Sequence, residues 1–141
     1  MKAARILTAV AVVAVAGAGL IACGQQKAAP GPVGLKRINF DFDKYNIKSE
    51  FVQTLKDNAG WIQKNAGRKV TVEGHCDERG TTEYNIGLGD RRAKSAKSYL
   101  VNLGVAGDRL STISYGEERP LCTQHNESCW WQNRRAEFQA K

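Results

Sequence analysis

The segment from Asn85 to Leu103 constrains the fold most strongly because it has the pattern of one long amphipathic helix with a charge on its inner side. Projected at about 100° per residue, its apolar side chains form one arc centred on Ala96. Arg92 lies about 40° from that centre and Asn85 also falls on the inner arc, whereas Arg91 lies about 140° away. Because an unpaired buried guanidinium is costly, the pattern predicts a partner or a ligand for Arg92 and solvent around Arg91.

The remaining segments alternate between strand and helix patterns. Strand patterns cover residues 36–45, 69–74 and 108–116, and an amphipathic helical pattern covers residues 48–65. The last segment, residues 133–140, is interpreted as a strand, although its helix propensity is nearly as high. This order predicts an α/β (α+β) sandwich with a βαβαβ core and a final strand. We expect parallel pairing through right-handed crossovers, with the helices mainly on one face of a small mixed sheet.

The first 22 residues have the organisation of a secretory signal peptide. Lys2 and Arg5 form a basic start, and residues 6–18 are uncharged and mostly apolar. This apolar run is short for a transmembrane helix, and small residues follow it up to Cys23. A genuine N-terminal membrane helix is the alternative interpretation.

The sequence Leu-Ile-Ala-Cys that ends at Cys23 resembles the lipobox of bacterial lipoproteins. The resemblance implies cleavage after residue 22 and acylation of the thiol and the new amine of Cys23, and several acyl chains anchor a protein firmly in a bilayer. Gly24 stands where an aspartate would imply retention in the inner membrane, so the resemblance implies the outer membrane, with the domain facing the periplasm. We interpret residues 23–35 as the lipidated N-terminus and a flexible tether, and residues 36–141 as one domain.

The charge of the chain narrows the class of partner. Lysine and arginine number 21 against 14 acidic residues, so the formal net charge is +7, and removal of Lys2 and Arg5 lowers it to +5. This mild basicity favours an anionic partner such as a cell-wall polymer or a lipid surface. We expect no nucleic-acid partner, because the basic residues do not gather with aromatic ones as a stacking platform requires.

The cysteines favour a disulfide over a metal site. Disulfides are permitted in an exported chain, and a short polar loop separates Cys122 from Cys129, so we predict a bridge between them that leaves Cys76 free. His75, Cys76, His125 and the two loop cysteines are possible metal ligands, but they lack zinc-site spacing. His75 and Cys76 are adjacent near a strand end and would point to opposite faces. We therefore predict no metal site and no cofactor.

Four stretches of the chain resemble the OmpA-like family of peptidoglycan-binding domains, and most closely its branch of peptidoglycan-associated lipoproteins. They are FDFDKYNI from Phe40, VEGHCDERGTTEYNIGLGDRRAKSAKSYL from Val72, ISYGEERP from Ile113 and NRRAEF from Asn133. The resemblance covers nearly all of residues 36–141, and the long central motif is highly specific.

The resemblance implies a noncovalent receptor for the diaminopimelate of the peptidoglycan stem peptide. In that family an aspartate and an arginine grip the ligand's amine and carboxylates, and their positions here are Asp77 and Arg92. Further positions that match the same pocket are Phe42, Asp43, Asn85, Leu88 and Arg134. The family usually has threonine or serine where Cys76 stands, and Gly87 replaces a usual serine.

The resemblance also implies partners and a location. It implies a tether between the outer membrane and the cell wall within the Tol-Pal system, with the periplasmic propeller protein TolB and other Tol proteins as partners on an overlapping surface. The cysteine loop is not part of the family pattern, so contacts there stay open. Trp130 and Trp131 either pack over the sheet edge or form a partner-binding aromatic patch.

The residues alone leave the use of the site open. Asp77 and Arg92 either pair with each other and staple the loop to the helix, or hold a ligand between them. An acid–base set can be drawn around Tyr84 and Asp77, but the chain offers no nucleophile–base signature, so we predict a binding module and not an enzyme. The sequence is also compatible with a structural spacer that ties the membrane to proteins of the envelope, and with a periplasmic receptor for a small molecule.

Overall fold

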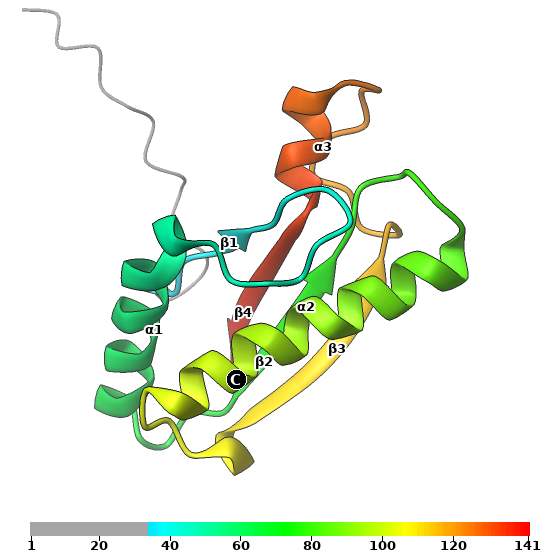
Figure 1. Ribbon diagram of the computed structural model, residues 1–141. Coiled ribbons are helices and arrows are strands. Elements are labelled where there is room, and N and C mark those ends of the chain that lie inside the picture. Colours follow the sequence, from blue (N-terminus) through cyan, green and yellow to red (C-terminus); the bar gives the residue numbers. More distant parts are fainter. Residues whose placement is uncertain (1–33) are drawn as a thin grey trace, which may run out of the picture.

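The computed structural model describes residues 34–141, so the predicted signal peptide and Cys23 lie outside the described residues. Two layers make up the fold (Figure 1). Helices α1 (Val52–Lys64) and α2 (Thr82–Asn102) cover one face of a four-stranded sheet. Its strands are β1 (Ile38–Asn39), β2 (Val70–His75), β3 (Leu110–Gly116) and β4 (Arg135–Ala140). Short helical segments complete it: η2 (Ser49–Phe51), η3 (Gly107–Arg109) and α3 (Glu127–Asn133).

The sheet is mixed, with the strand order β1-β4-β2-β3. Strands β2 and β3 are parallel, as predicted, whereas β4 runs antiparallel to both of its neighbours. The expectation of parallel pairing is therefore wrong for the first strand, because β4 lies between β1 and β2. Ala136 and Phe138 of β4 are buried in the core. The central position of β4 buries these apolar side chains, which would be half exposed if β4 were an edge strand.

The first strand is much shorter than the predicted residues 36–45. Phe40 stays fully buried, but its N–H already donates to the carbonyl of Arg134 outside the ladder. The chain then turns, with the Lys44 N–H bonded to the Asp41 carbonyl and Asp43 at a φ of 57°. Alternation of apolar and polar residues therefore continues past the point at which the backbone leaves the sheet.

Helix α2 packs unusually close to the sheet at two glycines. A Cβ atom added to Gly74 of β2 would lie 1.7 Å from the carbonyl oxygen of Gly89 of α2. Further along α2, Ala93, Ala96 and Leu100 are fully buried in the main core. Small residues on the inner face of α2 therefore bring the backbone of the helix almost against β2, which positions the side chains that follow β2 next to the first turns of α2.

The ends of α2 follow capping rules. Thr81 is the N-cap, and its hydroxyl accepts a hydrogen bond from the Tyr84 N–H, so the helix begins at Thr82 and not at the predicted Asn85. Its C-terminal end is followed by Gly104 at a φ of 99°, a left-handed conformation that favours glycine. Among residues 34–141, no helix is long and apolar enough to cross a bilayer.

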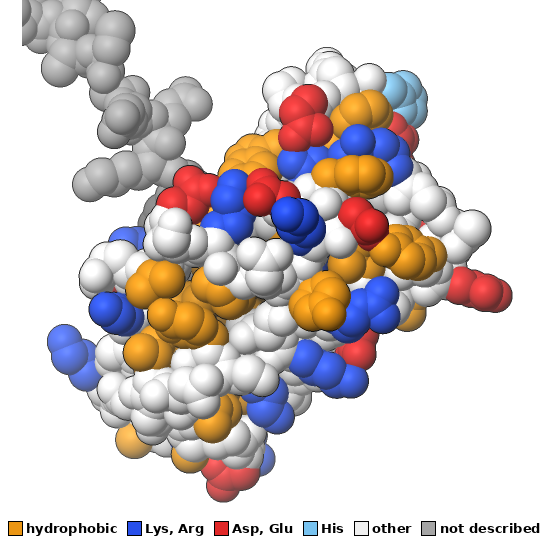
Figure 2. Space-filling model, viewed as in Figure 1, with side chains coloured by type: hydrophobic (Ala, Val, Ile, Leu, Met, Phe, Trp, Pro, Cys, Tyr) orange, Lys and Arg blue, Asp and Glu red, His pale blue; other side chains and the backbone are white. Residues whose placement is uncertain are grey.

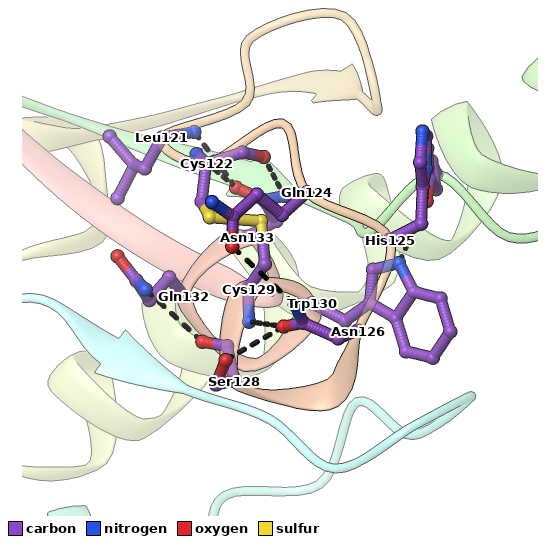
Figure 3. Close-up of a disulfide and its surroundings, with 11 residues drawn as sticks. Leu121, Cys122, Gln124, His125, Asn126, Ser128, Cys129, Trp130, Gln132 and Asn133 are labelled. Atoms are coloured by element: carbon purple, nitrogen blue, oxygen red, sulfur yellow. Dashed lines mark hydrogen bonds and ion pairs between the residues drawn. A yellow bond between two sulfur atoms is a disulfide. The ribbon is translucent and has the colours of Figure 1, made fainter.

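The cysteine loop folds into a helix that the sequence analysis missed. Cys122 and Cys129 are joined by a disulfide (Figure 3). Cys76 is a free, buried cysteine. Asn126 caps helix α3 by accepting from the Cys129 N–H, and Asn133 at the other end accepts from the N–H groups of Leu121 and Cys122. Two asparagines and one disulfide therefore close the loop on itself.

Candidate ligand-binding site

A cavity of about 220 Å³ opens where three segments meet: the turn after β1, the loop after β2 and the first half of α2. Acidic, basic and hydrophobic side chains crowd together in this region, between the turn after β1 and α3 (Figure 2). Pockets for drug-sized ligands usually have about 300–1,000 Å³, so this cavity is suited to the end of a chain and not to a whole molecule. The cavity is lined by Phe42, Asp43, Cys76, Asp77, Arg79, Gly80, Tyr84, Asn85, Leu88 and Arg92.

Arg92 is the largest fully buried side chain of the described residues, and it lines this cavity. Its guanidinium donates to three backbone carbonyls, from Nε to Lys44 at 2.8 Å, from Nη1 to His75 at 2.9 Å and from Nη2 to Asp41 at 3.1 Å. It also lies 5.2 Å from the ring centre of Phe40. The prediction that Arg92 points inward is confirmed, and its partners join the turn after β1 to the end of β2.

The charge of Arg92 has no counter-ion in this part of the chain. Within residues 34–141, no carboxylate oxygen lies within 4.0 Å of its nitrogens. Burial lowers the pKa of the Arg92 guanidinium below its usual range, which is the expected effect of removing a cation from water. Arg92 is therefore held by neutral oxygens and has no direct ion pair, although the carboxylates of Asp77 and Asp43 line the same cavity and favour its charge from a longer distance.

Asp77 is also buried, with 4% of its surface exposed, but it is fully paired. Its carboxylate accepts from the Arg79 N–H at 2.9 Å, from Arg79 Nη2 at 2.8 Å and from Arg134 Nη1 at 3.3 Å. Burial disfavours the charged form, but the two arginines outweigh it and hold the pKa of Asp77 below its usual range. The alternative in which Asp77 and Arg92 pair with each other is therefore wrong, although both line the same cavity.

Arg79 is the site residue that the sequence analysis missed. Its guanidinium lies between two aromatic rings, 3.8 Å from the centre of Phe42 and 4.1 Å from that of Trp130. Both rings can stabilise the cation through their π faces. The available signal was the spacing, because an aspartate commonly accepts from the backbone N–H two residues later in a turn.

Two other predicted site residues, Arg134 and Asn85, contact Asp77 and hold it in place. Arg134 is buried behind Asp77 and donates to the Phe40 carbonyl at 2.9 Å and to Glu127 at 2.5 Å, so it supports the site without lining the cavity. Asn85 is buried and donates to the carbonyls of Asp77 and Arg79, which holds the loop after β2 against α2.

The rim of the cavity is more exposed. Phe42 is 54% exposed, and the Tyr84 hydroxyl donates to the Asp43 carboxylate across the opening. Leu88 contributes an apolar wall. The Cys76 thiol donates to the Asn85 carbonyl at 3.2 Å, and burial raises its pKa to about 11, so it is a neutral thiol at physiological pH.

The two tryptophans have different surroundings. Trp131 stacks on Phe51 with ring centres 6.4 Å apart, and Lys48 lies over its ring, so it packs over η2. Trp130 instead contacts Arg79 and donates through Nε1 to Glu78 at 2.9 Å. Packing accounts for Trp131, whereas Trp130 belongs to the rim of the candidate site.

Comparison with known proteins identifies the fold and the family. The model of the OmpA family matches residues 39–134. Peptidoglycan-associated lipoproteins of Rhizobium meliloti and Pasteurella multocida are 48% and 50% identical, over 85% and 70% of this chain and 68% and 66% of their own lengths. The chain thus spans about two thirds of these relatives. None of these names describes an enzyme.

Solved structures agree with this assignment. The crystal structure of the peptidoglycan-associated lipoprotein from Burkholderia pseudomallei is 35% identical, with a TM-score of 0.72, and the match covers 74% of this chain and 89% of that one. The C-terminal domain of Helicobacter pylori MotB has the same fold at 23% identity and a TM-score of 0.71, over 77% of this chain and 85% of that one. With its mixed four-stranded sheet covered by helices and a matching family model, the chain belongs to the OmpA family.

Proposed function

We propose that this protein is an outer-membrane lipoprotein that binds peptidoglycan noncovalently and tethers the membrane to the cell wall. In this proposal the diaminopimelate of the stem peptide enters the cavity that Asp77 and Arg92 line. The observation that carries it is the buried guanidinium of Arg92 at the cavity wall, which has no direct ion pair among the described residues. The names of the relatives, which describe association with peptidoglycan, support the same class of ligand.

Arg92 is suited to a carboxylate. A guanidinium has five N–H groups, and three of those of Arg92 donate to backbone carbonyls, so two remain for a ligand. A carboxylate in the cavity would compensate the buried charge and accept charge-assisted hydrogen bonds, which are stronger than neutral ones. The three carbonyl contacts hold the guanidinium in place before a ligand arrives.

Diaminopimelate also presents an ammonium on the same carbon as its terminal carboxylate. Asp77 and, at the rim, Asp43 supply the anionic oxygens for that group. Arg79 already forms an ion pair with the Asp77 carboxylate, but the Arg79 side chain is 30% exposed and can be displaced. We infer that the ligand ammonium shares or replaces the contact between Arg79 and Asp77, whereas Arg134 stays behind Asp77 as a fixed partner.

A competition experiment tests this assignment. The detergent-solubilised full-length chain is sedimented with purified sacculi that contain diaminopimelate, in the presence of free diaminopimelate or Nα-acetyl-lysine amide. Nα-acetyl-lysine amide is a matched control because it keeps a side-chain ammonium but has no free carboxylate. We expect diaminopimelate to release the protein and Nα-acetyl-lysine amide to have little effect. Equal release by both compounds would refute the role of Arg92 as a carboxylate receptor.

We also propose Tol proteins, with TolB first among them, as partners on a surface that includes the rim of the cavity. The rim carries Phe42, Trp130 and Arg79, which are aromatic and arginine side chains of the kind enriched at protein interfaces. A partner that covers this rim would compete with the wall. Sedimentation with sacculi in the presence of TolB tests this, and simultaneous binding of both without loss of affinity would exclude an overlapping surface.

A further inference from the structure

Helices α1 and α2 leave the opposite face of the sheet uncovered (Figure 1). Strands β2 and β4 carry a second group of polar side chains that do not line the cavity. Glu73 and His75 lie two residues apart on β2, so they point to the same face. Glu137 of β4 is directly opposite Glu73 in the antiparallel register. One ligand atom from each of these three side chains lies within 4.8 Å of the others.

His75 is an unexplained buried group at the centre of this arrangement. Only 2% of its surface is exposed, and neither ring nitrogen has a hydrogen-bond partner. Buried polar groups in folded proteins are nearly always paired, so two unpaired nitrogens on one ring require a partner. Nε2 lies 3.5 Å from a carboxylate oxygen of Glu73, and Tyr115 stacks on the ring at 5.5 Å.

We propose that Glu73, His75 and Glu137 form a binding site for a first-row divalent cation such as Zn²⁺. Imidazole and carboxylate are ordinary ligands of these ions. A tetrahedral set with bonds of about 2.1 Å places its ligand atoms about 3.4 Å apart, so atoms that now lie within 4.8 Å of one another need to approach by up to about 1.4 Å. Three protein ligands leave one position for water or an anion.

The surroundings of the three ligands support this assignment. Two carboxylates that face each other across strands repel, and burial together with Glu137 raises the pKa of Glu73. Burial, followed by the charge of Arg135, lowers the pKa of His75 to about 4, so the ring is in the neutral form that binds metal ions.

Arg135 limits and shapes the site. Its Nε donates to Glu137 Oε1 at 2.6 Å, which orients the carboxylate. The Oε2 atom accepts a long hydrogen bond of 3.5 Å from Gln139 Nε2, which a bound cation would displace. Outer partners of this kind are usual for metal-binding carboxylates. Arg37 lies 4.0 Å from the same oxygen. Because these arginines bring positive charge, we expect selective but moderate affinity, and the bound ion would clamp β2 to β4.

Calorimetry and thermal unfolding test the site in the detergent-solubilised full-length chain. After treatment with EDTA and its removal, we expect ZnCl₂ to bind with one ion per chain. At a free Zn²⁺ concentration about 100 times the Kd, the unfolding temperature should rise by about 10 °C or more. Co²⁺ in place of Zn²⁺ should give visible absorption bands from its coordination.

Variants locate the ion. Glu137→Gln removes a ligand at a partly exposed position, so the fold should persist and Zn²⁺ affinity should fall at least about 10-fold. His125→Ala is the matched control, because His125 is exposed and pairs with Glu78 in the only other described contact between a histidine and a carboxylate. No binding up to about 1 mM Zn²⁺, or loss of binding in His125→Ala with retention in Glu137→Gln, would overturn the proposal. Sacculus binding should be unchanged in Glu137→Gln, because Glu137 does not line the cavity.

Discussion

Replacement of Arg92 by alanine should damage the fold as well as the ligand site. The substitution leaves the carbonyls of Asp41, Lys44 and His75 without their donor. A buried acceptor that loses its partner costs about 1–3 kcal/mol, so three would cost about 3–9 kcal/mol. Only the bond to the His75 carbonyl is fully buried, so we expect the free energy of unfolding to fall by about 3–6 kcal/mol, in the lower part of that range. Domains of this size have only about 5–15 kcal/mol in total, so Arg92→Ala should be close to the limit of stability.

Two further variants show whether the lost stability of Arg92→Ala comes from the carbonyl contacts or from the loss of a positive charge. Arg91→Ala is the matched control, because the side chain is exposed and makes only a 5.7 Å contact with the Tyr45 ring, and it should cost less than about 1 kcal/mol. Arg92→Lys keeps the charge, but a single ammonium cannot reproduce the planar fork that reaches three carbonyls. We therefore expect Arg92→Lys to be intermediate in stability.

Urea unfolding of the full-length chain, followed by tryptophan fluorescence, measures these differences. With an m-value of about 1–3 kcal/mol/M, the midpoint for Arg92→Ala should fall by more than about 1 M relative to Arg91→Ala. Sacculus binding is then compared only at urea concentrations at which every variant is folded. If Arg92→Ala and Arg91→Ala unfold within about 1 kcal/mol of each other, the three carbonyl contacts do not support the fold as argued.

Four other outcomes follow from the site and its surroundings. Asp77→Asn should weaken sacculus binding by about 2–5 kcal/mol, because it removes one partner of buried charges, and undiminished sedimentation would place the site elsewhere. The folded pKa of Asp77 lies below its ordinary value of 3.8, so its contribution to stability is present above that value and is lost as the pH falls through the folded pKa. Between pH 6 and pH 2, the free energy of unfolding of the wild type should therefore lose this contribution, whereas that of Asp77→Asn should not. In a Cys23→Ala chain, Cys76 should resist iodoacetamide at pH 8 and denaturation without reductant should expose one thiol, whereas three thiols would exclude the disulfide. Cys122→Ser should lower the free energy of unfolding by about 2.5 kcal/mol, measured in urea, and no change would show that the bridge does not constrain the unfolded chain.

The sequence was most informative where the geometry of a single helix determines whether a side chain is buried. Helical periodicity alone predicted that Arg92 is buried and Arg91 exposed, because both positions depend only on the geometry of α2. Periodicity cannot identify what Arg92 contacts. Its acceptors at Asp41 and Lys44 lie 51 and 48 positions away in the chain, in a turn whose φ of 57° at Asp43 was not predicted.

The failures concern pairings between distant segments. The order of strands did not indicate that β4 lies between β1 and β2, because the hydrophobic pattern of a strand does not name its neighbours. The same limit applies to the candidate cation site. His75 was considered with the adjacent Cys76, whereas its neighbours are Glu73 on the same strand and Glu137, which only the register of β2 and β4 brings near.

The shortness of β1 has a mechanical consequence if the N-terminus is anchored and the cavity holds the wall. The described chain enters the core at Leu35, and Phe42 already lines the cavity. These eight residues, even fully extended, span at most about 28 Å. Tension between membrane and wall would therefore pass along β1 and the turn that Arg92 holds, with Asn58 of α1 bonded to the backbone of Lys36 at the entry, and would bypass β3. The strength of such a link would be set by the hydrogen bonds of this short segment and not by the global stability of the domain.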